Sequence, residues 1–117
     1  MFDCQPPAPP SLRTRRSAGE RLRDALVDLV DRRATVVTHR EKSWASVTFA
    51  GARHTIQLVF DDEEAVEAGE LFIAALPDHE FAIPGQLVAD ATVIAVDHQL
   101  VPPSMRVTCE LLLLEDA

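Results

Sequence analysis

Residues 44–60 read WASVTFAGARHTIQLVF, and their pattern is the main evidence for a β-sheet. Apolar residues alternate with polar ones on both sides of Gly51: Val47 and Phe49 precede it, and Ile56, Leu58 and Phe60 follow it. Such a period of two residues is typical of a strand with one buried face. Because glycine adopts the positive φ that tight turns often need, the stretch predicts a β-hairpin that turns at residues 50–53.

The segment before the hairpin predicts a helix and a short strand. Ser17 and Glu20 have the S-x-x-E spacing of a capping box, in which each side chain binds the other residue's backbone N–H. Leucines at helical spacing follow, so an amphipathic helix is expected over residues 18–33. The β-branched residues 35–38 then favour a strand, and the polar residues 40–43 indicate a turn.

The segment after the hairpin predicts a second helix and two long strands. Asp61 or Asp62 can cap the helix, and Pro77 marks its end. Residues 78–85 lead back to the sheet, and strands are expected over 87–98 and 105–114, on either side of a Pro-containing loop.

This order, α-β-β-β-α-β-β, predicts an α+β fold with two helices packed on one face of a mainly antiparallel sheet of about five strands. Short connections favour antiparallel neighbours, because parallel strands need a crossover of about a dozen residues or more. The last two strands carry apolar residues at both parities, with Ile94, Val96, Leu112 and Leu114 on the second. A sheet that is apolar on both faces needs a second cover, and another copy of the chain could provide it.

The chain length of 117 residues suits one domain. Residues 1–16 are rich in Pro and Arg and predict a flexible arm, which leaves residues 17–117 as a single α+β domain. The sequence shows no signal peptide and no apolar run long enough to span a membrane, so a cytoplasmic protein without membrane contact is expected. With only two cysteines, a disulfide scaffold is not expected.

The charge is divided unevenly along the chain. Residues 1–33 hold seven Arg against five acids, giving +2, whereas residues 34–117 hold four basic residues against fourteen acids, giving −10. The acidic body disfavours nucleic-acid binding, which would have to come from the arm residues Arg13, Arg15 and Arg16.

The histidines are the first candidates for catalysis. His54, His79 and His98 could act as a general base, with Glu80, Asp97 or Glu110 as an orienting acid. The sequence contains no H-E-x-x-H or C-x-x-C spacing, so neither a metal site nor a cofactor is expected, although distant strands could still assemble a site. Cys109 lies between apolar strand residues, which favours a buried, inert thiol with a raised pKa over a nucleophile.

Binding candidates are Trp44 and Arg53 of the hairpin and the arginines of the arm. A Trp beside basic residues can form a recognition surface, although a lone Trp near a strand start also serves as a core anchor. The preferred hypothesis is a non-enzymatic homodimeric module that binds itself, a protein or a small ligand. The alternatives are a small hydrolase or isomerase with a His–carboxylate site, and a nucleic-acid-associated regulator that acts through the arm.

Overall fold

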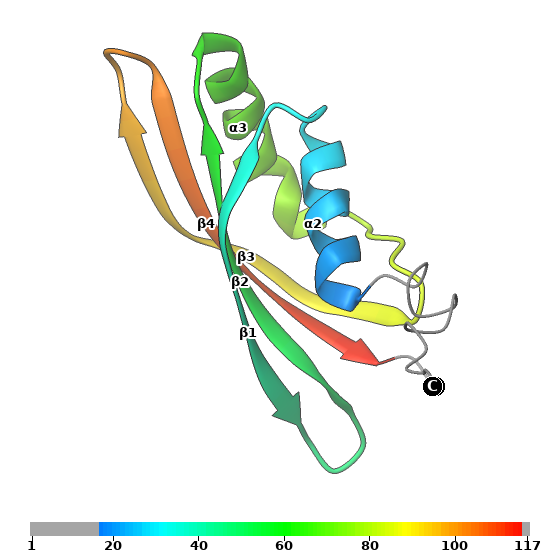
Figure 1. The fold of residues 1–117 in the computed structure, drawn as a ribbon. Helices are drawn as coiled ribbons and strands as arrows, with labels where there is room; N and C mark the ends of the chain where they lie inside the picture. The colour runs from blue at the N-terminus through cyan, green and yellow to red at the C-terminus, as the bar shows by residue number, and fades with distance from the viewer. Residues whose placement is uncertain (1–16, 116–117) are drawn as a thin grey trace, which may run out of the picture.

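The computed structural model describes residues 17–115, which form two α-helices, a short 3₁₀ helix and a four-stranded antiparallel sheet (Figure 1). The strand order in the sheet is β1-β2-β4-β3. In chain order the elements are α2 (Ala18–Leu29), β1 (Thr35–Ala45), β2 (Ala50–Phe60), α3 (Glu63–Ala75), η1 (Leu76–Asp78), β3 (Gln86–Gln99) and β4 (Ser104–Glu115).

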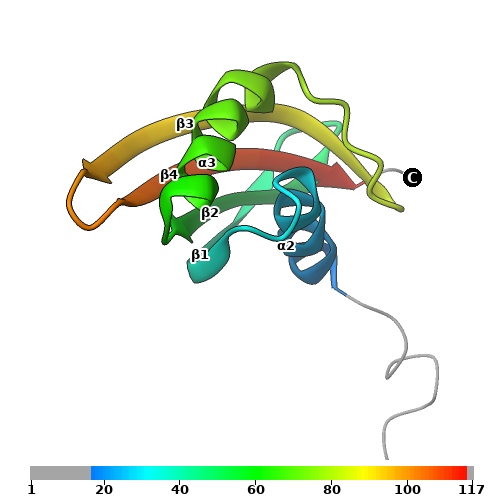
Figure 2. The ribbon, with the colours of Figure 1, turned by 90° about the horizontal axis from the view of Figure 1, so that it is seen from above.

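Both helices cover the same face of the curved sheet, as Figure 2 shows. The predicted α+β class is therefore confirmed, with four strands in place of five. The difference arises because residues 40–43 do not turn: they pair with residues 52–55 and continue β1 as an edge strand. The hairpin turn lies at residues 46–49, and Gly51 lies inside β2, so the predicted turn at residues 50–53 is wrong.

Helix α2 begins as predicted and ends early. The Ser17 Oγ accepts a hydrogen bond from the Glu20 N–H, and the Glu20 carboxylate accepts one from the Ser17 N–H, which completes the capping box. The helix ends at Leu29 rather than at residue 33, because Asp31 and Arg32 adopt left-handed backbone angles with φ of 53° and 60°. Two consecutive residues with positive φ cannot continue a right-handed helix.

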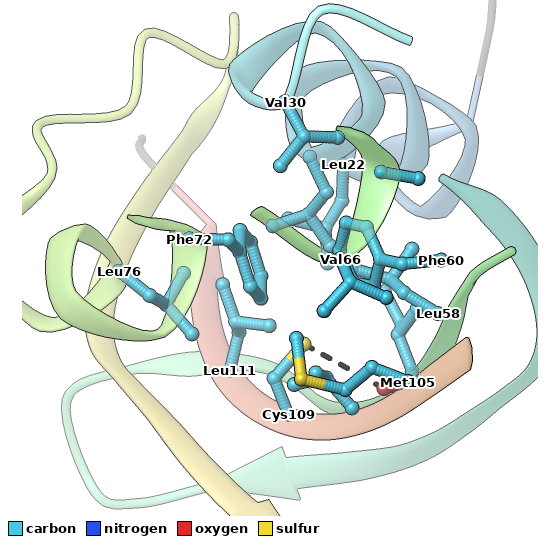
Figure 3. Packing of buried hydrophobic residues seen from close by; sticks show 14 of the residues in the cluster. Leu22, Val30, Leu58, Phe60, Val66, Phe72, Leu76, Met105, Cys109 and Leu111 are labelled. Carbon is cyan, nitrogen blue, oxygen red and sulfur yellow. Dashed lines mark hydrogen bonds between the residues drawn. The ribbon is translucent and has the colours of Figure 1, made fainter. Parts of the chain in front are cut away.

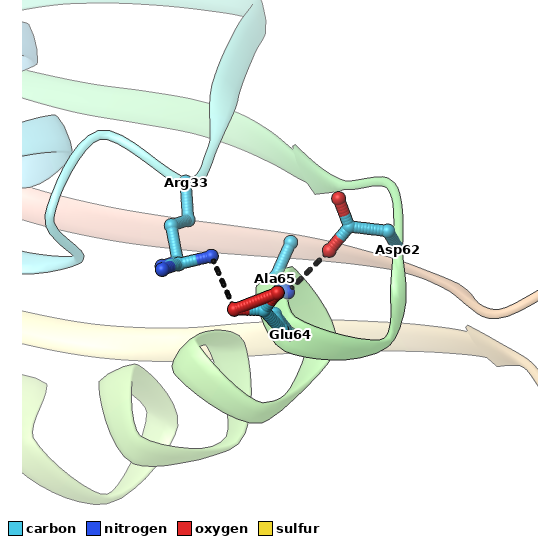
Figure 4. Close-up of polar contacts among 4 residues, drawn as sticks. All are labelled: Arg33, Asp62, Glu64 and Ala65. Atoms are coloured by element: carbon cyan, nitrogen blue, oxygen red, sulfur yellow. Dashed lines mark hydrogen bonds and ion pairs between the residues drawn. The ribbon is translucent and has the colours of Figure 1, made fainter.

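Side-chain contacts fix the start of α3 (Figure 4). The Asp62 carboxylate caps the helix by accepting a hydrogen bond of 2.7 Å from the Ala65 N–H, as predicted for one of the two aspartates. Arg33, in the connection from α2 to β1, forms an ion pair of 3.2 Å with Glu64. This pair joins the two helical regions at the surface.

The core lies between the helices and the sheet (Figure 3). Helix α2 contributes Leu22 and Leu26, and α3 contributes Phe72. Alternate residues of the two central strands complete it: Ile56, Leu58, Phe60, Met105, Val107, Cys109, Leu111 and Leu113. The alternation in β2 thus follows the predicted parity. Among residues 17–115, no helix is long and apolar enough to cross a membrane.

The open face of the sheet is mostly polar, which corrects the expectation of two apolar faces. Register shifts between Val88 and Asp90, and between Val93 and Ala95, indicate bulges in β3. The second shift places Val96 opposite Val107, on the side of the helices. The open face of β4 carries Arg106, Thr108 and Glu110 before it becomes apolar at Leu112 and Leu114.

Candidate functional site

A polar cluster interrupts the apolar interface between α2 and the sheet. Glu41 of β1 lies directly opposite His54 of β2, and His39 lies opposite Ile56. Because His39 and Glu41 are two residues apart on one strand, their side chains share the face that His54 and Ile56 occupy on the next. That face is covered by α2, and His54 is only 1% exposed.

A chain of hydrogen bonds connects α2 to this cluster. The Arg23 guanidinium of α2 donates to Nδ1 of His39, because arginine has no acceptor. Nδ1 therefore carries no proton, and Nε2 of neutral His39 does. Nε2 lies 2.8 Å from Nδ1 of His54 and donates to it. The two rings are 5.1 Å apart between centroids and tilted by 45°.

A glycine in the first turn of α2 allows this close approach. A Cβ placed on Gly19 would lie 3.0 Å from Cε1 of His39 and 3.6 Å from an oxygen of Glu41. The helix backbone therefore lies close to both side chains, although that of Glu41 stays exposed. The N-terminal end of a helix carries partial positive charge, which favours the nearby carboxylate of Glu41.

The surroundings of both imidazoles favour the neutral form. Burial is the main cause that lowers the pKa of His39, and the neighbouring His54 and Arg23 lower it further, while Glu41 opposes them. Burial likewise lowers the pKa of His54, against the opposing effect of Glu41. A neutral imidazole keeps a nitrogen lone pair, which is the form that binds metal ions.

The donor atoms of His39, Glu41 and His54 all lie within 4.8 Å of one another. Two imidazole nitrogens and a carboxylate oxygen are ligands that zinc accepts, with water in the fourth position. Sequence reasoning did not identify this set, because no local motif carries it. The available signal was strand parity, which puts His39 and Glu41 on one face, combined with a hairpin register that brings His54 across from them.

The candidate catalytic histidines predicted from the sequence lie in separate parts of the fold. His54 lies under α2, whereas the ring of His79 packs edge-on against Phe81, with centroids 4.5 Å apart, in the segment that follows η1. His79 and Glu80 line a shallow surface pocket, and His98 lies exposed near the far end of β3.

Trp44 and Arg53 lie on the open face of the sheet. Trp44 lies opposite Gly51, and Arg53 forms an ion pair of 3.2 Å with Glu110 of β4. His54, next to Arg53 in the strand, points to the opposite face, so these three residues do not share one recognition surface. Arg13, Arg15 and Arg16 lie outside the described residues.

Exposed apolar side chains gather at the two hairpin ends. Val47 and Phe49, at the β1–β2 turn, are 102% and 50% exposed, and Leu100 and Val101, at the β3–β4 turn, are 75% and 87% exposed. The two turns project at opposite ends of the sheet, beyond the part that the helices cover (Figure 1). These two turns are called the β1–β2 tip (residues 46–49) and the β3–β4 tip (residues 100–103) below.

Comparisons with known proteins show a likeness of fold. No protein-family model matches the chain, and no curated protein matches it in sequence. A chain in the solved structure titled "Virion of native gene transfer agent (GTA) particle" is similar, with a TM-score of 0.51 and 15% sequence identity. The match covers 85% of this chain and 92% of that one. At this identity the likeness shows a shared fold.

Proposed function

We propose that the chain is a non-enzymatic structural subunit that joins copies of itself head to tail in a multicopy particle. The observation that carries this proposal is the pair of hairpins whose apolar tips project at opposite ends of the sheet. An apolar side chain at a loop tip contributes nothing to the core. Several such side chains gathered at one place are typical of a surface that binds another protein.

The charges of the two ends are complementary. Around the β1–β2 tip, residues 40–53 contain three basic residues and one acidic residue. At the other end, residues 61–70 contain six acidic residues and no basic one. This acidic segment follows β2, whose last residue, Phe60, pairs with Met105 near the base of the β3–β4 hairpin. The acidic segment and the β3–β4 tip thus belong to the same end of the sheet.

This distribution favours a head-to-tail contact over the symmetric dimer expected from the sequence. In a two-fold dimer that joins one tip to the same tip of the other copy, like charges would face each other. In a head-to-tail contact the basic β1–β2 end of one copy meets the acidic β3–β4 end of the next. Opposite charges then speed association, and the apolar tips add burial. Repeating one such contact produces a ring or a filament.

The similarity to a chain of a virion particle supports the proposal, since particles of that kind are built from repeated protein contacts. The two chains match over most of their lengths, so the likeness extends over most of the fold. His54, His79 and His98 lie in separate parts of the described fold, so the three candidate histidines do not form one site.

The test is the molar mass of the untagged full chain by size-exclusion chromatography with light scattering. We expect an assembly larger than a dimer at low salt, and a lower mass at about 1 M NaCl, where charge attraction is screened beyond about 3 Å. Val47→Asp should reduce the mass to that of a monomer. Leu71→Asp is the matched control, because Leu71 is 71% exposed and belongs to α3 rather than to either tip.

Two results would overturn the proposal: a wild-type chain that stays monomeric at every concentration and salt level, or a Val47→Asp variant that assembles as well as Leu71→Asp. Circular dichroism of each variant checks that the fold is retained. A stable dimer that does not respond to Val47→Asp would instead favour the two-fold module predicted from the sequence.

A further inference from the structure

The cluster formed by His39, Glu41 and His54 is built like a metal site, and this inference does not depend on the proposed assembly. We propose that it binds a zinc ion through Nε2 of His39, Nδ1 of His54 and the Glu41 carboxylate, with water as the fourth ligand. Each ligand comes from the paired strands β1 and β2, whose ladder fixes the distances between the three side chains.

The spacing of the two imidazole nitrogens supports a shared cation. Nε2 of His39 and Nδ1 of His54 are 2.8 Å apart, so two bare lone pairs would repel each other, and one proton lies between them. A zinc ion takes the place of that proton. With zinc–nitrogen distances of about 2.0–2.1 Å, tetrahedral geometry needs the nitrogens about 3.3 Å apart. The rings therefore have to separate by about half an ångström, which small side-chain rotations provide.

The carboxylate is available as the third ligand. Within residues 17–115, Glu41 forms no hydrogen bond and no ion pair, and its side chain lies on the exposed part of the strand. His54, in contrast, is buried, so the site is closed on the core side and open on the side of Glu41. A water ligand can enter from that open side, as in zinc sites that keep an exchangeable position.

Arg23 regulates the occupancy of the site. While its guanidinium donates to Nδ1 of His39, the ring proton stays on Nε2, which is the nitrogen that zinc needs. When zinc binds Nε2 of His39, the ring proton moves to Nδ1. Nδ1 then has no lone pair to accept a hydrogen bond from Arg23, so the Arg23 side chain must move away. Zinc binding thus replaces the hydrogen bonds from Arg23 to His39 and from His39 to His54 with a metal site formed by His39, Glu41 and His54.

Substitution of Arg23 tests the proposed zinc site, because Arg23 competes with zinc binding. Metal-bound histidines usually donate their second N–H to an acceptor, and the loss of such a partner lowers metal affinity by about 10–100-fold. Arg23→Gln replaces the competing donor with a side chain that can accept from Nδ1. We therefore expect this variant to bind Zn²⁺ about 10-fold more tightly than the wild type.

The experiment is calorimetric titration of the untagged full chain with Zn²⁺, repeated with Co²⁺ for the absorption spectrum of a tetrahedral nitrogen–oxygen site. We expect His39→Gln and Glu41→Gln each to weaken binding at least about 10-fold. The matched controls His98→Gln and Glu67→Gln change exposed residues outside the cluster and should bind as the wild type does. Because His54 is buried, its variant could fail to fold, so the test rests on the other residues.

Three results would overturn the proposal. The first is a wild-type chain that does not bind Zn²⁺ at all. The second is binding that is unchanged in His39→Gln and Glu41→Gln, which would place the metal elsewhere. The third is an Arg23→Gln variant that binds no more tightly than the wild type, which would remove Arg23 from the site.

Discussion

Cys109 lies in the centre of the core, where β4 passes beneath the helices. Its side chain is fully buried, and its thiol donates a long hydrogen bond of 3.6 Å to the carbonyl of Ile56. The burial of this thiol, expected from the neighbouring apolar residues, is confirmed. Burial raises its pKa to about 12, because a thiolate would lose its hydration there.

The thiol should therefore be unreactive in the folded protein. In a Cys4→Ser variant, where Cys109 is the remaining cysteine, we expect alkylation by iodoacetamide to be much slower in the folded than in the unfolded protein between about pH 8 and pH 10, because the buried thiol is mostly protonated there. An exposed thiol, with a pKa of about 8.5, is largely ionised across that range and would react quickly. Mass spectrometry follows the reaction, and the unfolded variant is the control. Fast alkylation of the folded variant would contradict the burial.

The polar cluster shows what a sequence can reveal about a site at this scale. His39 and Glu41 are two residues apart in a β-branched segment, so their shared face follows from parity alone. Their pairing with His54 depends on the position of the turn. A turn at residues 50–53 would place His54 opposite Phe49, whereas the observed turn at 46–49 places it opposite Glu41. Because the turn was predicted at residues 50–53, the cluster of His39, Glu41 and His54 was not predicted.

The elements themselves were predicted where local chemistry decides them. The capping box and the Asp62 cap require only neighbouring residues, and both are present. The end of α2 and the length of β1 were missed for different reasons. Asp31 and Arg32 adopt positive φ although neither is a glycine, so the sequence does not indicate that the helix ends there. The polar residues 40–43 resemble a turn, but an edge strand exposes such side chains to solvent.

Gly51 shows why a glycine inside a strand need not mark a turn. A Cβ at this position would lie 2.0 Å from the carbonyl oxygen of Leu113 and 2.8 Å from the Cα of Leu114. The backbones of β2 and β4 therefore approach each other more closely than an alanine permits. Glycine in a strand often marks such a contact.

We expect Gly51→Ala to lower the free energy of unfolding by about 1–3 kcal/mol, because the backbone of β4 must move. Gly69→Ala in α3 is the comparison. A Cβ there would meet the flexible end of Met105 at 2.4 Å and the ring of Phe60 at 3.0 Å. Alanine also favours the helix by about 1 kcal/mol, so this variant should lose less stability. Urea unfolding measures both, and an equal or smaller loss for Gly51→Ala would contradict the close approach.

The whole molecule combines a covered face, an open face and two projecting hairpins. The sequence allowed the class, the helix-covered face and the antiparallel pairing to be predicted, because alternation and short connections suffice for these. It did not reveal that bulges in β3 move Val96 to the helix side, since an added residue reverses the parity after it. The expected apolar second face is therefore limited to the end of β4, at Leu112 and Leu114, and further exposed apolar residues lie on β3 and at the hairpin tips.

The separation of basic and acidic residues is visible only in the folded molecule. The basic residues of 40–53 and the acidic residues of 61–70 are close in sequence, yet β2 carries the chain from one end of the sheet to the other. The strand thus separates them into two ends of opposite charge. This separation is the reason for preferring a head-to-tail contact to a symmetric one.

The most direct test of head-to-tail assembly is native mass spectrometry of two variants, Val47→Asp and Leu100→Asp, measured separately and mixed. Each blocks one tip, so each alone should be a monomer. Mixed in equal amounts, the intact β1–β2 tip of one variant can bind the intact β3–β4 tip of the other, and a 1:1 heterodimer should form and grow no further. A mixture that stays monomeric, or a variant that assembles by itself, would contradict the account.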